Sequence, residues 1–149
     1  MIQRKQTIFL LLALAAMVVC LCLPIGSTAS HGLAAHSEWY NLGVYAPNGL
    51  NAQPLLFIDL VVAGSLTLID IFLYTRRRLQ MKICVASIIL CLVWYGYYVF
   101  RAVSEFAPQG GFHVGFAVCL PFVAIVFLIL ARRGIKADED LIKSMDRIR

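Results

Sequence analysis

The chain has 149 residues, of which 61 % are hydrophobic and 14 % are charged. Soluble domains carry about 25 % charged residues, so this composition excludes a water-soluble globular protein and predicts one integral membrane domain over residues 1–149. The net charge of +5 comes from short basic clusters beside apolar runs. That pattern is typical of membrane-flanking loops and not of a nucleic-acid-binding surface, so we expect no nucleic-acid partner.

Four apolar runs are long enough to cross a hydrocarbon core about 30 Å thick as helices. Inside a bilayer a helix satisfies its own backbone, so the predicted fold class is an all-α membrane protein, a four-transmembrane-helix bundle whose first partner is the lipid bilayer. The predicted spans are residues 7–25, 54–74, 83–100 and 114–131.

The first run allows a second interpretation, a cleaved signal peptide, because it has a basic start, an apolar stretch and small residues at 27–30. Cleavage would leave three spans and an outward N-terminus. The run is long for the apolar part of a signal peptide, and four spans already agree with the distribution of basic residues. We therefore expect the first run to be retained as a helix.

The outer loop, residues 26–53, contains no Lys or Arg. A turn signal at 47–49 contains Asn-Gly and is flanked by Tyr45 and Leu50, which predicts a small β-hairpin. An isolated hairpin is marginally stable in water. The hairpin is therefore expected to need support from the membrane face or from a partner.

Aromatic residues gather on the same side. Trp39, Tyr40 and Tyr45 lie in the outer loop, and Tyr and Trp favour positions where one end of the ring is apolar and the other is wet. We identify these three residues as a candidate surface for a protein partner. The alternative is that the loop packs its own aromatics over the helix ends.

Two acids lie in the second run, Asp59 and Asp70. They are eleven residues apart, about three helical turns, and so share one helix face. Because a charge within a bilayer helix is costly, such residues suggest function, here a proton or cation relay. The structural interpretation pairs Asp70 with Arg76 or Arg77. It pairs Asp59 with Arg101 or a tyrosine hydroxyl, and we favour it because neither acid is at mid-bilayer.

The basic residues predict the orientation. Twelve of the thirteen would flank the inner ends of the four spans, and Arg101 alone falls outside. The excess of Lys and Arg marks the cytoplasmic side, so both termini are expected to be cytoplasmic. Arg101 is four residues before Glu105, a spacing that predicts a local ion pair, with Asp59 as an alternative partner for Arg101.

The fourth run contains Pro121, which lacks a backbone N–H and is predicted to kink the helix near Ala117. Gly115 is expected to allow a close approach by a neighbouring segment. After this run, the tail at 132–149 is predicted to form a separate amphipathic helix that lies on the membrane or docks on a partner. Its apolar residues at helical spacing are Leu141, Ile142, Met145 and Ile148.

The sequence predicts no metal site and no catalytic site. His31, His36, Glu38 and His113 have no metal-site spacing, so we expect solvated side chains and no metal. The five cysteines all lie in apolar runs, where they are expected to pack as small apolar residues, although a disulfide from Cys20 or Cys22 to Cys119 is conceivable. No nucleophile, base and orienting group occur together, so neither an enzyme nor a bound cofactor is predicted.

Both ends of the chain have a distinctive sequence. Residues 1–8 read MIQRKQTI, residues 130–141 read LARRGIKADEDL, and residues 146–149 read DRIR. These ends resemble a family of small four-span membrane proteins of Bacteroidota, known as domain of unknown function 4293, and the resemblance extends over essentially the whole chain. It implies a location in a bacterial inner membrane and no activity, cofactor or catalytic residue.

The sequence therefore predicts an integral inner-membrane protein that acts as an accessory or assembly subunit, with a membrane-protein partner or a second copy of itself. The surfaces expected to make those contacts are the outer aromatic loop and the charged tail. The alternative is a small transporter or ion-conducting protein that uses Asp59 and Asp70. An obligate partner would favour the first, and a loss of function on neutralising both acids would favour the second.

Overall fold

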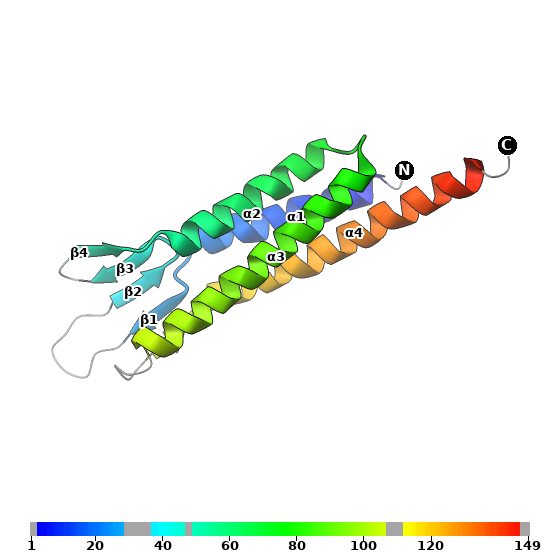
Figure 1. Ribbon diagram of the computed structural model, residues 1–149. Coiled ribbons are helices and arrows are strands. Elements are labelled where there is room, and N and C mark those ends of the chain that lie inside the picture. Colours follow the sequence, from blue (N-terminus) through cyan, green and yellow to red (C-terminus); the bar gives the residue numbers. More distant parts are fainter. Residues whose placement is uncertain (1–2, 29–36, 47–48, 107–111, 147–149) are drawn as a thin grey trace.

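Four helices lie side by side in an elongated bundle (Figure 1). The computed structural model describes residues 3–28, 37–46, 49–106 and 112–146. α1 packs against α2 and α4, and α3 packs against the same two helices, so the four form a ring. Their bounds are α1 Gln3–Cys22, α2 Leu55–Phe72, α3 Arg77–Arg101 and α4 Cys119–Asp146.

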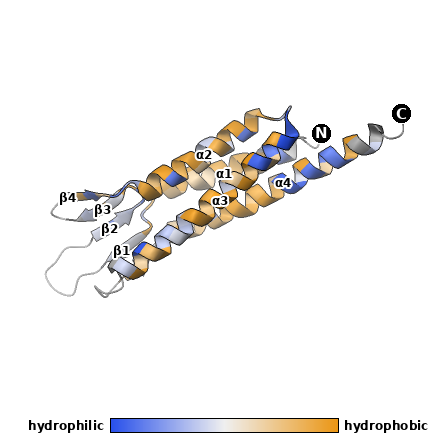
Figure 2. Ribbon diagram, viewed as in Figure 1, coloured by the Kyte–Doolittle hydropathy of each residue, from blue (hydrophilic) through white to orange (hydrophobic). Residues whose placement is uncertain are grey.

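Membrane crossing is supported by length and composition for three helical segments in the described part of the chain. They are Leu55–Phe72, Arg77–Ser104 and Phe116–Ile142. The apolar part of α1, Gln6–Cys22, is shorter. Figure 2 shows that the middle of the bundle is apolar and that hydrophilic residues gather at the end where both termini lie. The chain therefore has the character of a membrane protein.

The loops at the other end form a five-stranded sheet, where the sequence predicted a single hairpin. The strand order is β4-β3-β2-β1-β5 and every pair is antiparallel. The predicted hairpin is confirmed as β3 and β4, which pair Tyr45 with Leu50. The strands are β1 Gly26–Thr28, β2 Ser37–Tyr40, β3 Gly43–Ala46, β4 Gly49–Ala52 and β5 Phe112–Val114.

The all-α prediction was therefore too narrow. Residues 26–28, after the first apolar run, and residues 112–114, at the start of the fourth, form strands that pair with each other. The backbone N–H of Gly115 donates to the Ile25 carbonyl at 3.0 Å. A Cβ at Gly115 would lie 2.5 Å from the Pro24 carbonyl oxygen, so the predicted close approach at this glycine is confirmed.

The fourth helix begins later and ends later than predicted. A 3-10 turn, Phe116–Val118, precedes α4. Pro121 therefore lies in the first turn of α4, where a missing N–H costs nothing. The predicted kink near Ala117 was wrong. The Tyr95 hydroxyl accepts the Phe122 N–H of that turn at 3.0 Å. The tail is no separate helix, because α4 continues through it to Asp146.

Candidate functional site

The two acids of α2 both face α3, so the prediction that they share one helix face is confirmed. Asp59 lines a groove whose other wall belongs to α3, and Asp70 hydrogen-bonds a side chain of α3. They are ~16 Å apart along the helix axis at 1.5 Å per residue. Between them Ala63 is buried, while Ser65 is exposed and bonds its own helix. The contact between α2 and α3 is therefore a polar seam with an acid towards each end.

The groove lies near the sheet end of the bundle, which is the end that carries the strands β1–β5. Its volume is about 340 Å³, and apart from Asp59 its lining is almost wholly aliphatic and aromatic. Ile58 and Val62 are exposed at its rim. The lining residues are Leu55, Leu56, Ile58, Asp59, Val62, Leu90, Val93, Trp94 and Tyr97. A single carboxylate thus lies in an apolar groove that opens on the side of the bundle.

The carboxylate of Asp59 lacks the partners that the sequence suggested. Its Oδ2 atom is buried and accepts no hydrogen bond from the residues that the structure describes. Arg101 makes no ion pair with Asp59 within that part of the chain. The Arg101 guanidinium, in a side chain only 4 % exposed, lies 6.0 Å from the Trp39 ring centroid and donates to the Tyr97 hydroxyl at 3.4 Å. The side chain of Glu105, the other predicted partner, lies outside the described residues.

Asp70, at the other end of the seam, is fully buried. The Cys84 thiol donates to its Oδ2 at 2.9 Å, and the Gln80 amide donates to its backbone carbonyl at 3.2 Å. The predicted pairing with Arg76 or Arg77 was wrong, because Arg77 reaches across to α4 instead. The Cys84 thiol of α3 takes the place of the arginines at Oδ2, while Oδ1 is buried and accepts no hydrogen bond from the described residues.

Two hydroxyls lie between the acids. The Thr67 hydroxyl donates to the Ala63 carbonyl at 2.9 Å and lies 3.4 Å from the Ser87 hydroxyl of α3. Both residues are buried. Small side chains that bond across a helix contact are typical of membrane helix packing. The middle of the seam therefore joins α2 to α3.

The three aromatic residues proposed as a partner surface differ in how exposed they are. Trp39 is 2 % exposed and stacks on Tyr98 of α3 at a ring-centroid distance of 5.0 Å, so it covers the helix ends, as the alternative expected. Tyr45 is 46 % exposed. Tyr40 is partly buried, and its donation to Glu38 at 2.8 Å raises the pKa of the phenol. Of the three residues, Tyr45 and Tyr40 keep area for a partner.

Asn41 was missed by sequence reasoning and holds the sheet on the bundle. Its side chain is fully buried in the turn between β2 and β3. Asn41 Nδ2 donates to the Cys20 carbonyl at 2.7 Å, and Trp94 Nε1 donates to Asn41 Oδ1 at 2.9 Å. The Tyr98 hydroxyl adds a bond to the Ile25 carbonyl at 3.1 Å. The sequence placed Asn41 in the outer loop, but nothing in it indicated a buried amide.

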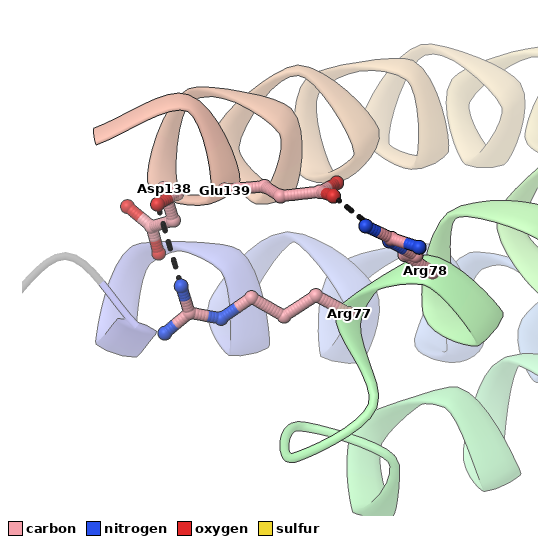
Figure 3. A network of polar contacts seen from close by, with 4 residues as sticks. All are labelled: Arg77, Arg78, Asp138 and Glu139. Carbon is pink, nitrogen blue, oxygen red and sulfur yellow. Dashed lines mark hydrogen bonds and ion pairs between the residues drawn. The ribbon is translucent and has the colours of Figure 1, made fainter. Parts of the chain in front are cut away.

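The opposite end, which we call the basic end, brings together the start of α1, the start of α3 and the second half of α4. Gln6 Nε2 donates to Asp138 Oδ2 at 2.6 Å, a buried contact that was not predicted. Figure 3 shows the neighbouring contacts: Arg77 donates to the Asp138 carbonyl at 3.3 Å, and Arg78 pairs with Glu139 at 3.3 Å. The signal for Asp138 was its spacing, seven residues after the buried Ala131 and three after the buried Ile135, which is the spacing of one helix face.

The tail residues proposed for a partner lie away from these contacts. Leu141 and Ile142 are exposed, while the side chains of Met145 and Ile148 lie outside the described residues. Ile135 and Asp138 form the buried face of this segment instead. Gly134 faces Gln6 closely, since a Cβ there would lie 3.0 Å from Gln6 Cγ. The tail therefore packs on α1 through Gly134 and Asp138, and it leaves Leu141 and Ile142 exposed.

Metal and disulfide chemistry find little support in the described part of the chain. Within it, no three His, Cys, Asp or Glu side chains are grouped as metal ligands, and His31 and His36 lie outside it. All five cysteines are free, so the conceivable disulfide to Cys119 is not formed. Cys20 instead donates to the Ala117 carbonyl at 3.4 Å.

Comparison with known proteins gives a family and no activity. The model of the family described as "Domain of unknown function (DUF4293)" matches residues 2–148, nearly the whole chain. No curated protein matches the chain.

Proposed function

We propose that this chain, which belongs to the family of domain of unknown function 4293, is a non-enzymatic subunit of a complex in a bacterial inner membrane. In this proposal all four helices cross the bilayer, with both termini cytoplasmic and the sheet outside. The main observation behind this proposal is Asp59, whose buried Oδ2 accepts no hydrogen bond from the described residues, in an apolar groove on the side of the bundle.

The membrane placement is supported by the distribution of charge. Arg77 and Arg78 contact the second half of α4, so the basic clusters of two segments meet at one end. The sheet end has one Lys or Arg, which is Arg101. A bundle with one basic end and one nearly free of bases satisfies the positive-inside rule without rearrangement. α1 takes part in the same core through Leu10, Ala13 and Met17.

A carboxylate in hydrocarbon without a donor is costly, because neither lipid tails nor aliphatic side chains replace its lost water. Asp59 lies about 6 Å along the axis from the start of α2, within the proposed outer leaflet. A transmembrane helix with a Lys, Arg or amide side chain at that depth would fill the apolar groove and supply the donor. The groove therefore suits a partner helix better than lipid alone.

The partner is a different protein in this proposal. A second copy in the same orientation has Arg101 as its sole Lys or Arg at the sheet end, and that residue is buried against Trp39 and Tyr97. All other Lys and Arg residues flank the opposite ends of the predicted spans. Self-association would therefore offer Asp59 no Lys or Arg side chain other than the buried Arg101.

The test is site-specific photo-cross-linking in cells at native expression level. A photoreactive residue at Ile58 or Val62, on the groove rim, is expected to capture one membrane protein, and one at the exposed Ile129 of α4 is the matched control. Asp59→Leu should abolish the product, and Asp59→Asn, which keeps the shape and can still hydrogen-bond, should retain part of it. Equal products from Ile58 and Ile129, or cross-links to a second copy only, would overturn the proposal.

A second candidate, a proton or cation relay, is favoured by one observation. The hydroxyls of Thr67 and Ser87 lie on the same seam between the two acids. Proton flux in proteoliposomes that Asp59→Asn and Asp70→Asn each abolish would establish this candidate. Flux absent from the unmodified chain would exclude it and leave the subunit proposal standing.

A further inference from the structure

We propose that a pocket between α3 and α4 at the basic end binds the phosphate of an anionic phospholipid of the inner leaflet. The pocket has a volume of about 540 Å³. It is lined by Arg78, Met81, Lys82, Val85, Arg132 and Glu139. Three cations and one carboxylate therefore share a single pocket formed by two helices.

The charges favour an anion. Arg78 and Lys82 are four residues apart on α3 and so project from one face, and Arg132 approaches from α4. The acid in the pocket, Glu139, is engaged by Arg78 Nε at 3.3 Å. A guanidinium has five N–H donors, so this ion pair uses a small part of the capacity of Arg78. The lining thus keeps an excess of positive charge.

The position of the pocket favours a lipid over a soluble anion. Lys82 directly precedes the apolar run that starts at Ile83, so the cations lie at the depth expected for headgroups. Met81 and Val85 form apolar walls beside them. Basic pockets between transmembrane helices on the cytoplasmic side are typical sites for anionic headgroups.

Exposed aliphatic side chains continue from the pocket towards the middle of the bundle. Ile89 on α3 lies seven residues, about two turns, after Lys82, and Ile129 on α4 lies three residues before Arg132. Both are exposed, which suits contact with an acyl chain. The phosphate of a phospholipid would therefore lie at the basic pocket, and its acyl chains would lie along Ile89 and Ile129 towards the middle of the bundle.

The test is native mass spectrometry of the full chain in mild detergent, titrated with phosphatidylglycerol or phosphatidylcholine. We expect the unmodified chain to retain phosphatidylglycerol preferentially. The double variant Lys82→Gln with Arg132→Gln should bind it roughly 25-fold more weakly, since each base near the surface contributes about a fivefold factor. The double variant Arg133→Gln with Lys136→Gln is the matched control, because it loses the same charge from exposed sites of α4 outside the pocket lining.

Three results would overturn the inference. They are equal retention of the two lipids, an equal loss in both double variants, and displacement of phosphatidylglycerol by inorganic phosphate at equal concentration. If the pocket variant does not fold, Lys82→Arg with Arg132→Lys keeps both charges and is expected to keep binding. The inference rests on the proposed membrane placement and not on the partner helix, so Asp59→Leu should leave lipid retention unchanged.

Discussion

The sheet end and the basic end are joined to the bundle in different ways. At the sheet end, Asn41 and Trp39 are buried and connect a loop to helices through hydrogen bonds and ring stacking. At the basic end, Arg78 and Glu139 meet in an ion pair whose arginine side chain is 83 % exposed. One end is held by contacts without water, and the other largely by charges in water.

The difference matters because a buried polar group that loses its partner pays the full cost of desolvation, whereas an exposed one returns to water. Single side chains should therefore control the sheet end, and ionic strength should affect only the basic end. The basic end also has buried bonds in the described part of the chain, such as the one between Gln6 and Asp138. Three predictions test this contrast in the purified full chain in mild detergent.

The largest effect is expected for Asn41→Ala. It leaves the Cys20 carbonyl and the Trp94 indole N–H buried without partners, so the free energy of unfolding should fall by about 3 kcal/mol. Thermal unfolding followed by far-UV circular dichroism measures the loss. Asn51→Ala, at an exposed position of β4, is the control and should be nearly neutral. If the two variants melt together, the sheet does not depend on this amide.

An intermediate effect is expected at Gly115, which follows β5 and packs against the backbone of Pro24 and Ile25. Gly115→Ala places a methyl group 2.5 Å from the Pro24 carbonyl oxygen, so backbone must shift and stability should fall by about 2 kcal/mol. Gly96→Ala in α3 is the matched control. No atom lies within 4 Å of a Cβ there, so the helix should gain about 0.5–1 kcal/mol. The two alanines should therefore move the melting temperature in opposite directions, and equal signs would contradict the packing at Gly115.

Much of the fold could be read from the sequence because long apolar runs are a strong signal. The bounds of α2 differ from the prediction by one or two residues. The shared face of Asp59 and Asp70 followed from helical geometry alone. The partner of Asp70 was wrong, since the nearest arginines were chosen by charge, whereas packing against α3 places Cys84 and Gln80 opposite the acid.

Features of the fold that depend on contacts between residues far apart in the chain could not be predicted from the sequence. β5 has three residues at the edge of an apolar run, and it is a strand only because β1 lies beside it. Asn41 looks like an ordinary turn residue, and its bonds reach residues 21 and 53 positions away. Hydropathy ends the fourth span at Ala131, and the sequence predicted a separate helix in the tail. In the structure the two are one continuous helix, which packs on α1 where Gly134 faces Gln6.

The smallest effect is expected for Arg78→Gln, and its value lies in its salt dependence. The ion pair with Glu139 at 3.3 Å is largely exposed on the arginine side, so its removal should lower stability by less than about 1 kcal/mol in low salt. A double-mutant cycle with Glu139→Gln isolates the coupling, which should vanish near 1 M salt, where the Debye length is about 3 Å. The loss in Asn41→Ala should persist at the same salt concentration, because water and ions do not reach that bond. A coupling that survives high salt would mean that the basic end is held by shielded contacts like the sheet end, and the contrast between the two ends would be lost.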